Sequence, residues 1–149
     1  PQGLEVIRDY IGRPPRWRTL DEAAAALPAA MAPAFADVPE ATWRAHAARL
    51  WEEGPDGLRL RYDPPLRDAV LAQSGAEVDL WPFFDALAGK PLALIRGANS
   101  DLLTAETTAE MRRRRPDMIV AEVPDRGHVP FLDEPEAVAA IEAYLGRVT

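Results

Sequence analysis

Apolar residues recur at helical spacing in three segments of the first half of the chain, since positions three and four apart share one face of a helix. They predict three helices: residues 4–12, 20–31 and 39–53. Gly12 ends the first, a Thr19–Glu22 capping box begins the second, and Pro39 and Gly54 bound the third. Four apolar residues are expected to share one face of the third helix: Trp43, Ala47, Leu50 and Trp51.

The pattern changes twice in the remainder of the chain. Clean alternation over residues 58–62 predicts a short half-exposed strand, and two short amphipathic segments predict helices over 65–72 and 80–88. From residue 90, continuous apolar runs, typical of strands buried on both faces, alternate with helical segments. The predicted elements are strands over 91–95 and 118–123 and helices over 105–115 and 135–146. Thr104 and an Asp133–Glu136 capping box begin these helices. This order predicts a right-handed parallel crossover unit of an α/β sheet.

Composition excludes several classes of function. The chain has 149 residues, 48% apolar and 28% charged, which suits one folded domain. It lacks cysteine, so a disulfide framework and thiolate chemistry are excluded. No run of about 18 apolar residues and no signal peptide is visible, so we expect a cytoplasmic protein without a membrane partner. A net charge of −7 argues against nucleic-acid binding. The basic run Arg112–Arg115 is interpreted as the solvated last turn of a helix.

Two titratable residues follow the two predicted strands. Asp101 lies in the loop after the first strand and His128 in the loop after the second. The carboxyl ends of parallel strands are where open α/β sheets place catalytic groups, so both loops are expected at one sheet edge. A carboxylate on one imidazole nitrogen fixes the tautomer while the other nitrogen takes a proton. The pattern therefore suggests an orienting acid and a general base, although Asp101 can instead stabilise its loop through an Asx turn.

Other polar residues are weaker candidates. Asp125 is the alternative acid, but it lies in the same loop as His128 and is expected to shape the turn. His46 lies within a predicted helix near Trp43 and is expected to pack there or to be solvated. No cluster of His, Asp or Glu has metal-ligand spacing, and no glycine-rich phosphate loop is present, so no metal and no cofactor are expected.

Residues 90–147 resemble the C-terminal end of the α/β-hydrolase family. The matching stretches are Pro91–Leu103, an apolar strand with a glycine-containing loop, and Val123–Pro130, a strand followed by Gly-His. The resemblance implies that Asp101 is the triad acid and His128 the triad base. It also implies a partial α/β-hydrolase fold with two domains: a helical cap over residues 1–75 and the C-terminal portion of the core over 76–149.

The family pattern includes a nucleophile that this sequence lacks. In α/β-hydrolases the nucleophile lies on a Gly-x-Ser-x-Gly elbow, or an equivalent with Asp, upstream of the cap. Neither Ser74 nor Ser100 is flanked by glycines at that spacing. Together with the first residue, Pro1, this predicts the C-terminal piece of a longer hydrolase. Two strands leave an open sheet edge, which is expected to bind the missing N-terminal half or a second copy.

The function expected from the resemblance is hydrolysis of an ester, lactone or similar small apolar substrate. With a Ser nucleophile, His128 would take the serine proton and then activate water. With an Asp nucleophile, which attacks halides or epoxides, His128 would mainly activate the hydrolytic water. Asp101 would orient His128 in both cases, and the chain alone is predicted to be inactive. The alternative is a non-catalytic, hydrolase-like module that binds a partner through its open edge.

Overall fold

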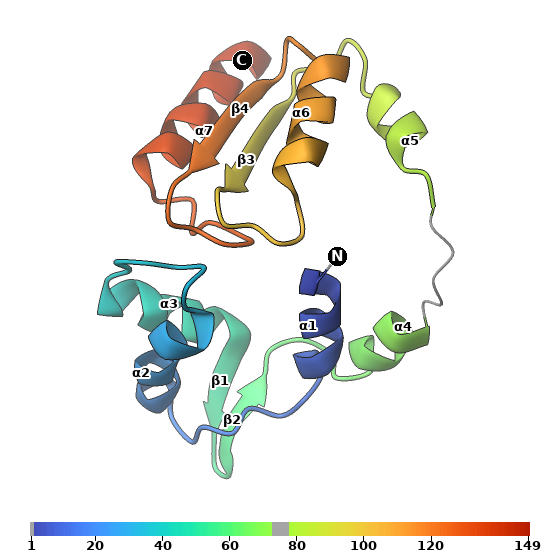
Figure 1. Cartoon of the computed structure of the whole chain (residues 1–149). Coiled ribbons are helices and arrows are strands. Elements are labelled where there is room, and N and C mark those ends of the chain that lie inside the picture. Colours follow the sequence, from blue (N-terminus) through green and yellow to red (C-terminus); the bar gives the residue numbers. More distant parts are fainter. Residues whose placement is uncertain (1, 73–77) are drawn as a thin grey trace. The chain divides into compact units, whose positions relative to one another are not determined.

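The computed structural model describes residues 2–72 and 78–149, and the chain divides into two compact units, Pro1–Gly75 and Ala76–Thr149 (Figure 1). The described elements of the first unit are α1 (Gln2–Tyr10), α2 (Leu20–Met31), α3 (Glu40–Leu50), β1 (Trp51–Gly54), β2 (Gly57–Leu60) and α4 (Leu66–Ala72). Those of the second are α5 (Trp81–Asp85), β3 (Ala93–Gly97), α6 (Ala105–Arg114), β4 (Ile119–Val123) and α7 (Pro135–Val148). Helices and strands are therefore mixed, as the sequence predicted.

The first unit is built around the packing of α2 against α3. The Thr19 hydroxyl accepts a hydrogen bond from the Glu22 amide at 3.1 Å, so the predicted N-cap of α2 is confirmed. The buried apolar residues of this unit come from both helices, the segment between them and β2: Ala23, Ala24, Leu27, Phe35, Trp43, Ala47 and Leu58. Small alanines on α2 and α3 let the helices approach closely. Trp43 is 2% exposed, and its ring centre lies 5.9 Å from that of Phe35.

The prediction that the third helix continues to residue 53 is wrong. The helix ends at Leu50, and β1 pairs with β2 in an antiparallel hairpin that places Trp51 opposite Leu60. Trp51 has extended backbone angles, and its ring lies 5.3 Å from the ring of Trp17. The tertiary contacts of Trp51 and the ladder to β2 outweigh the helical pattern. Trp51 therefore does not share a helix face with Trp43.

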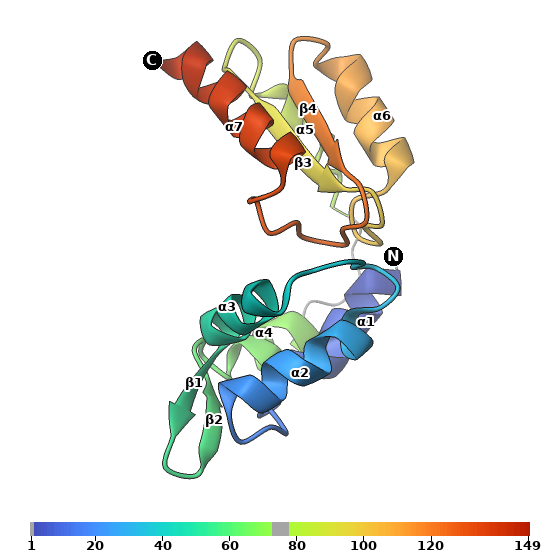
Figure 2. The ribbon, with the colours of Figure 1, turned by 90° about the vertical axis from the view of Figure 1, so that its left-hand side faces the viewer.

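The second unit contains the parallel strand pair that the sequence predicted. β3 and β4 pair in register from Ala93 opposite Ile119 to Gly97 opposite Val123. Helices α6 and α7 lie on opposite sides of this pair (Figure 2), and α7 packs against both strands. β3 begins two residues later than predicted, and its first three residues are half-buried instead of buried on both faces. Val123 at the end of β4 is 1% exposed.

The helix predicted over residues 80–88 is shorter in the structure. α5 ends at Asp85, and the following residues form single turns, with the Lys90 amide bonded to the Leu87 carbonyl. Phe83 is 68% exposed, so α5 buries little apolar surface that would extend it. Among residues 2–72 and 78–149, no helix has the length and apolar character needed to cross a bilayer.

The basic run at the end of α6 is only partly solvated, so its interpretation is corrected. Arg115 is 6% exposed and donates to the Leu87 and Lys90 carbonyls, both at 2.7 Å. The Arg114 guanidinium carbon lies 4.4 Å from the centre of the Trp81 ring. Arg115 therefore connects the end of α6 to the segment before β3, since its planar guanidinium can serve several carbonyl acceptors at once.

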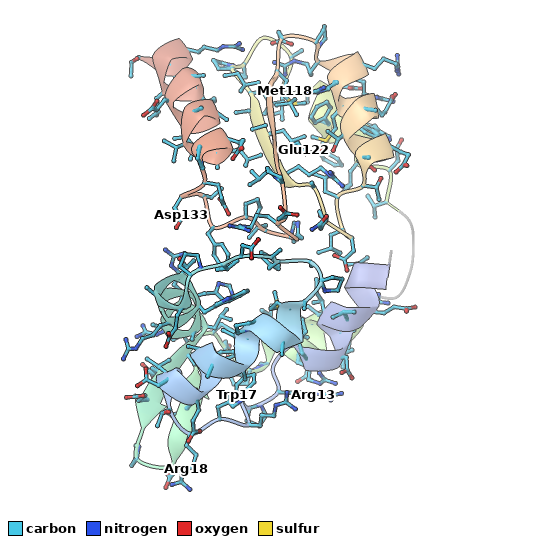
Figure 3. The ribbon with its side chains drawn as sticks, turned by 60° about the vertical axis from the view of Figure 1, so that its left-hand side comes forward. Arg13, Trp17, Arg18, Met118, Glu122 and Asp133 are labelled. Carbon is cyan, nitrogen blue, oxygen red and sulfur yellow. The ribbon has the colours of Figure 1, made fainter. Side chains whose placement is uncertain are left out.

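The capping box predicted at Asp133–Glu136 is also wrong. The N-cap of α7 is Glu134, whose side chain does not cap the helix. Pro135 takes the first helical position because its fixed φ suits it and it has no N–H to satisfy. Asp133 is exposed and lies in the segment that leads into α7 (Figure 3), one residue too early to act as the N-cap.

Candidate functional site

The loops after β3 and β4 lie at the same edge of the sheet. The strands are parallel neighbours, so their carboxyl ends coincide at the pair Gly97 and Val123. Two backbone hydrogen bonds connect the loops beyond this point. The Ala98 amide donates to the Val123 carbonyl at 2.8 Å, and the Asn99 amide donates to the Arg126 carbonyl at 2.9 Å. The loop that carries Asp101 is thus joined to the loop that carries His128.

Gly97 permits this close approach. A side-chain carbon at this position would collide with the carbonyl oxygens of Arg126 and Gly127 and would lie 2.7 Å from the Arg126 carbonyl carbon. These obstacles are backbone atoms that cannot rotate away as a flexible side chain would. Gly97 therefore allows the backbone of one loop to lie directly on the other.

The loop that carries Asp101 is held by polar side chains that flank this residue. Ser100 is buried, and its hydroxyl accepts a hydrogen bond from the Leu103 amide at 3.1 Å. Arg96, 6% exposed, donates to the Leu103 carbonyl at 2.7 Å and forms an ion pair with Glu122 of β4 at 2.8 Å. The ends of the loop are thereby fixed on both sides of Asp101.

The loop that carries His128 is held by a partly buried arginine that pairs with a buried carboxylate. The Arg126 Nε donates to Glu134 Oε1 at 2.8 Å, and the side chains are 15% and 7% exposed. Burial alone would raise the pKa of Glu134. Hydrogen bonds from the Phe131 and Leu132 amides and from Arg126 outweigh this effect, so the net pKa of Glu134 is lowered. The carboxylate therefore remains charged near neutral pH, where it pairs with Arg126.

The structure joins the two loops but does not join the two candidate side chains. Asp101 and His128 are both exposed. Within residues 2–72 and 78–149, neither side chain forms a hydrogen bond or an ion pair with the other. Ser100, not Asp101, provides the side-chain hydrogen bond that stabilises the turn. The catalytic roles of Asp101 and His128 remain predictions from the sequence.

The weaker candidates occupy structural positions. Asp125 has φ of 54°, in the left-handed region that Asp adopts more readily than most residues, so it shapes the turn as expected. His46 lies edge-on to Trp43, with ring centres 6.2 Å apart, and burial followed by the charge of Arg49 lowers its pKa. Ser74 lies outside the described residues. No group of metal-binding side chains occurs among the residues that the structure describes.

Sequence reasoning missed the buried Arg96, the partly buried Arg126 and the buried Glu134. Arg96 had a usable signal, because a charged residue inside an otherwise apolar run implies a buried partner. Glu134 had only a misleading signal, because its position just before Pro135 fits a general helix start. Arg126 stands in a polar loop, where an arginine is ordinary, so only the fold reveals its pairing with Glu134.

Comparisons with known proteins give the family context. No protein-family model matches the chain. Over 148 residues the chain is 38% identical to a 3-hydroxybutyrate-oligomer hydrolase from Cupriavidus necator, a match that covers 93% of this chain and 50% of that protein. It is 32% identical over 105 residues to a 2-(acetamidomethylene)succinate hydrolase from Mesorhizobium japonicum, covering 69% of this chain and 36% of that protein.

A solved structure agrees with the sequence likeness. An alpha/beta hydrolase from Novosphingobium aromaticivorans superimposes with a TM-score of 0.87 and 38% identity, covering 99% of this chain and 52% of that one. The chain thus spans about half or less of the length of the proteins it matches. Over that length, the sequence and the arrangement of strands and helices show that the chain has the α/β-hydrolase fold.

Proposed function

We propose that this chain supplies the acid and the base of an α/β-hydrolase that cleaves carboxylic esters. His128 is the general base and Asp101 the residue that orients it. The observation that carries the proposal is the backbone connection between the loops after β3 and β4, through the bonds from Ala98 and Asn99. This connection joins the two loops at one sheet edge, which is where the proposal requires the acid and the base to be.

The nucleophile of the proposed site lies outside these 149 residues. The sequence contains no Gly-x-Ser-x-Gly elbow, and the chain spans about half the length of the curated relative at 38% identity. In addition, Ala93, Leu94 and Ile95 of β3 are only half-buried. Apolar strand residues gain stability when a further strand and its covering layer exclude water from them. We therefore propose that the partner is a segment that brings a further strand to this sheet edge.

The proposed chemistry follows from the properties of a neutral imidazole. With a serine nucleophile, one nitrogen of His128 accepts the hydroxyl proton as the serine oxygen attacks the carbonyl carbon. The imidazolium then gives this proton to the leaving alkoxide, so that the alcohol departs and an acyl-enzyme remains. The same nitrogen next takes a proton from water as the acyl-enzyme is hydrolysed, and returns it to the serine oxygen when the acid leaves. Asp101 accepts the hydrogen bond of the other nitrogen, which fixes the tautomer and stabilises the imidazolium. With an aspartate nucleophile, His128 would only take a proton from the water that hydrolyses the covalent intermediate.

The substrate class rests on the relatives. One is named as a hydrolase of 3-hydroxybutyrate oligomers, and a hydroxy acid forms linear oligomers through ester bonds. We therefore propose short esters and oligoesters as substrates. The 149-residue chain by itself is expected to show no turnover, because it carries the base without the nucleophile.

Hydrolysis of p-nitrophenyl butyrate and of a 3-hydroxybutyrate dimer by the full-length protein tests the proposal. His128→Ala and Asp101→Asn should each lower kcat by about 10⁴-fold, as loss of a triad member does. Asp125→Asn is the matched control, because it removes a carboxylate three residues from His128 and keeps a residue that tolerates positive φ; its activity should change less than about threefold. Unchanged activity in the His128 and Asp101 variants would contradict their proposed roles, and absence of hydrolysis by the unaltered protein would favour a non-catalytic binding module.

A further inference from the structure

The segment between β4 and α7 closes around a single buried carboxylate. Glu134 is 7% exposed and accepts three hydrogen bonds. Its Oε1 accepts from Arg126 Nε at 2.8 Å and from the Phe131 amide at 3.1 Å, and its Oε2 accepts from the Leu132 amide at 2.9 Å. One donor precedes His128 in the sequence and two follow it. Glu134 therefore holds both sides of the loop in which His128 lies.

Two residues of this loop adopt backbone angles that need support. Leu132 has φ of 68° and Asp125 has φ of 54°. A leucine in the left-handed region costs about 1–2 kcal/mol, because its Cβ crowds the backbone. The Leu132 amide donates to Glu134, and the Asp125 carbonyl accepts from Arg126 Nη1 at 2.9 Å. The ion pair thus stabilises the two bends on either side of His128.

Arg126 also connects this loop to the loop of Asp101. Its side chain binds Glu134 and the Asp125 carbonyl, and its guanidinium carbon lies 5.8 Å from the centre of the Phe131 ring. Its backbone carbonyl accepts the hydrogen bond from the Asn99 amide. Arg126 therefore contacts both loops, its own through its side chain and that of Asp101 through its backbone carbonyl.

We propose that Arg126 and Glu134 are the positioning residues of His128, and that their ion pair sets where the imidazole stands relative to the loop of Asp101. The inference rests on the proposed function, since positioning is meaningful only for a base that acts. A buried ion pair is a poor source of net stability, but its directional bonds can select one arrangement of a loop. An apolar pair of similar volume would fill the space without binding the Phe131 and Leu132 amides.

Two measurements on the full-length protein test this role in Glu134→Gln and Arg126→Met. The first is hydrogen exchange of the peptide spanning residues 129–134, read by mass spectrometry, which reports the loop without reference to activity. Glutamine keeps one acceptor oxygen, so one of the three donors to Glu134 must lose its partner. Exchange should become at least about tenfold faster in both variants, as expected if about 1.4 kcal/mol of local stability is lost.

The second measurement is the steady-state kinetics of ester hydrolysis. A displaced base leaves substrate binding intact, so kcat should fall by about 10- to 100-fold and KM should stay within about twofold. Arg126→Lys, which keeps the charge, should recover part of kcat. Glu110→Gln is the matched control, because it removes a carboxylate that pairs with arginines on α6, away from the loop; both readouts should match the unaltered protein.

Each outcome decides the proposal. Faster loop exchange together with a lower kcat and an unchanged KM supports it. Unchanged exchange in Glu134→Gln overturns it, whatever the kinetics. Faster exchange with unchanged kcat, in a protein that His128→Ala inactivates, overturns the positioning role and leaves the proposed function standing. Full activity in His128→Ala removes the proposed function, and the positioning role with it, even if the exchange result holds.

Discussion

The loops after β3 and β4 are stabilised by different parts of the molecule. The loop of Asp101 is held from the strands, because Arg96 of β3 binds the Leu103 carbonyl and Glu122 of β4. The loop of His128 is held from the next helix, because Arg126 binds Glu134 at the start of α7. Both arrangements use an arginine, buried in the first and partly buried in the second, but the two arginines bind different segments. The first depends on the strand pair, and the second depends on contacts within the segment between β4 and α7.

The two helices that follow the loops differ in the same way. α6 begins with a side-chain cap, in which the Thr104 hydroxyl accepts from the Thr107 amide at 3.2 Å. α7 begins at Pro135 without a side-chain cap, and the carboxylate of its N-cap, Glu134, binds the preceding loop. The N-cap side chain of α6, Thr104, thus stabilises its helix, whereas the N-cap side chain of α7, Glu134, stabilises the loop before the helix. The loop that would present the base receives the additional support.

Gly97→Ala should have the largest effect, because it separates the two loops. The added carbon would collide with the Arg126 and Gly127 carbonyls, so the free energy of unfolding should fall by about 3 kcal/mol, at the upper end of overpacking costs. Urea unfolding measures this. Gly146→Ala is the control: it lies in α7 with open space around it, and alanine there should raise stability by up to about 1 kcal/mol. Equal changes in the free energy of unfolding for the two variants would contradict the close approach of Gly97 to the backbone of Arg126 and Gly127.

Arg96→Met should have the next largest effect and should act on one loop alone. It leaves the Leu103 carbonyl without its donor, and a lost partner of this kind costs about 2 kcal/mol. Glu122 is half-exposed and can be hydrated, which limits the loss. Hydrogen exchange should rise in residues 98–104 and stay unchanged in 129–134. Arg113→Met removes an exposed pair and should cost less than about 1 kcal/mol. A change in both loops would show that they are not independently held.

The position of the loops was predictable from sequence because it depends on strand order. Two continuous apolar runs separated by a capped helix predict adjacent parallel strands, and such strands bring their following loops to one edge. The hairpin of β1 and β2 was not predictable in the same way. Trp51 and Leu50 continue a helical pattern, and the ring contact with Trp17 that favours a strand arises only when the chain is folded.

The support of the candidate site was less predictable than its location. Glu134 resembles an ordinary helix start, and its bonds to the Phe131 and Leu132 amides exist only because the loop bends back on it. The sequence predicted that the side chain of Asp101 could stabilise this loop, but the hydrogen bond that does so is accepted by the Ser100 hydroxyl. Short-range patterns indicate which residues can act, but the partner of a buried charge depends on contacts between segments that fold together.

Acidification should loosen the His128 loop through Glu134. Because its folded pKa is lowered, Glu134 contributes stability that is present above its unfolded value of 4.5 and is lost as the pH falls through the folded value. Burial and the hydrogen bonds shift the pKa of Glu134 in opposite directions, so the stability lost on acidification should be smaller than that lost in Arg96→Met. Hydrogen exchange of residues 129–134, corrected for the intrinsic pH dependence, should show a loss of protection that begins as the pH falls to about 4.5 and increases below it. This loss of protection should be smaller in Glu134→Gln than in the unaltered protein. Equal losses in the two proteins would contradict a role of Glu134 in the pH dependence.

The smallest expected effects distinguish the beginnings of the two helices. Thr104→Ala removes the hydroxyl that accepts from the Thr107 amide, which should lower the free energy of unfolding by about 1 kcal/mol. Asp133→Ala should change it by less than about 0.5 kcal/mol, because Asp133 is exposed and is not the N-cap of α7. Urea unfolding of the two variants side by side measures the difference. If Asp133→Ala costs as much as Thr104→Ala, then α7 is capped at Asp133 in solution, and Glu134 is less committed to the loop than its three hydrogen bonds indicate.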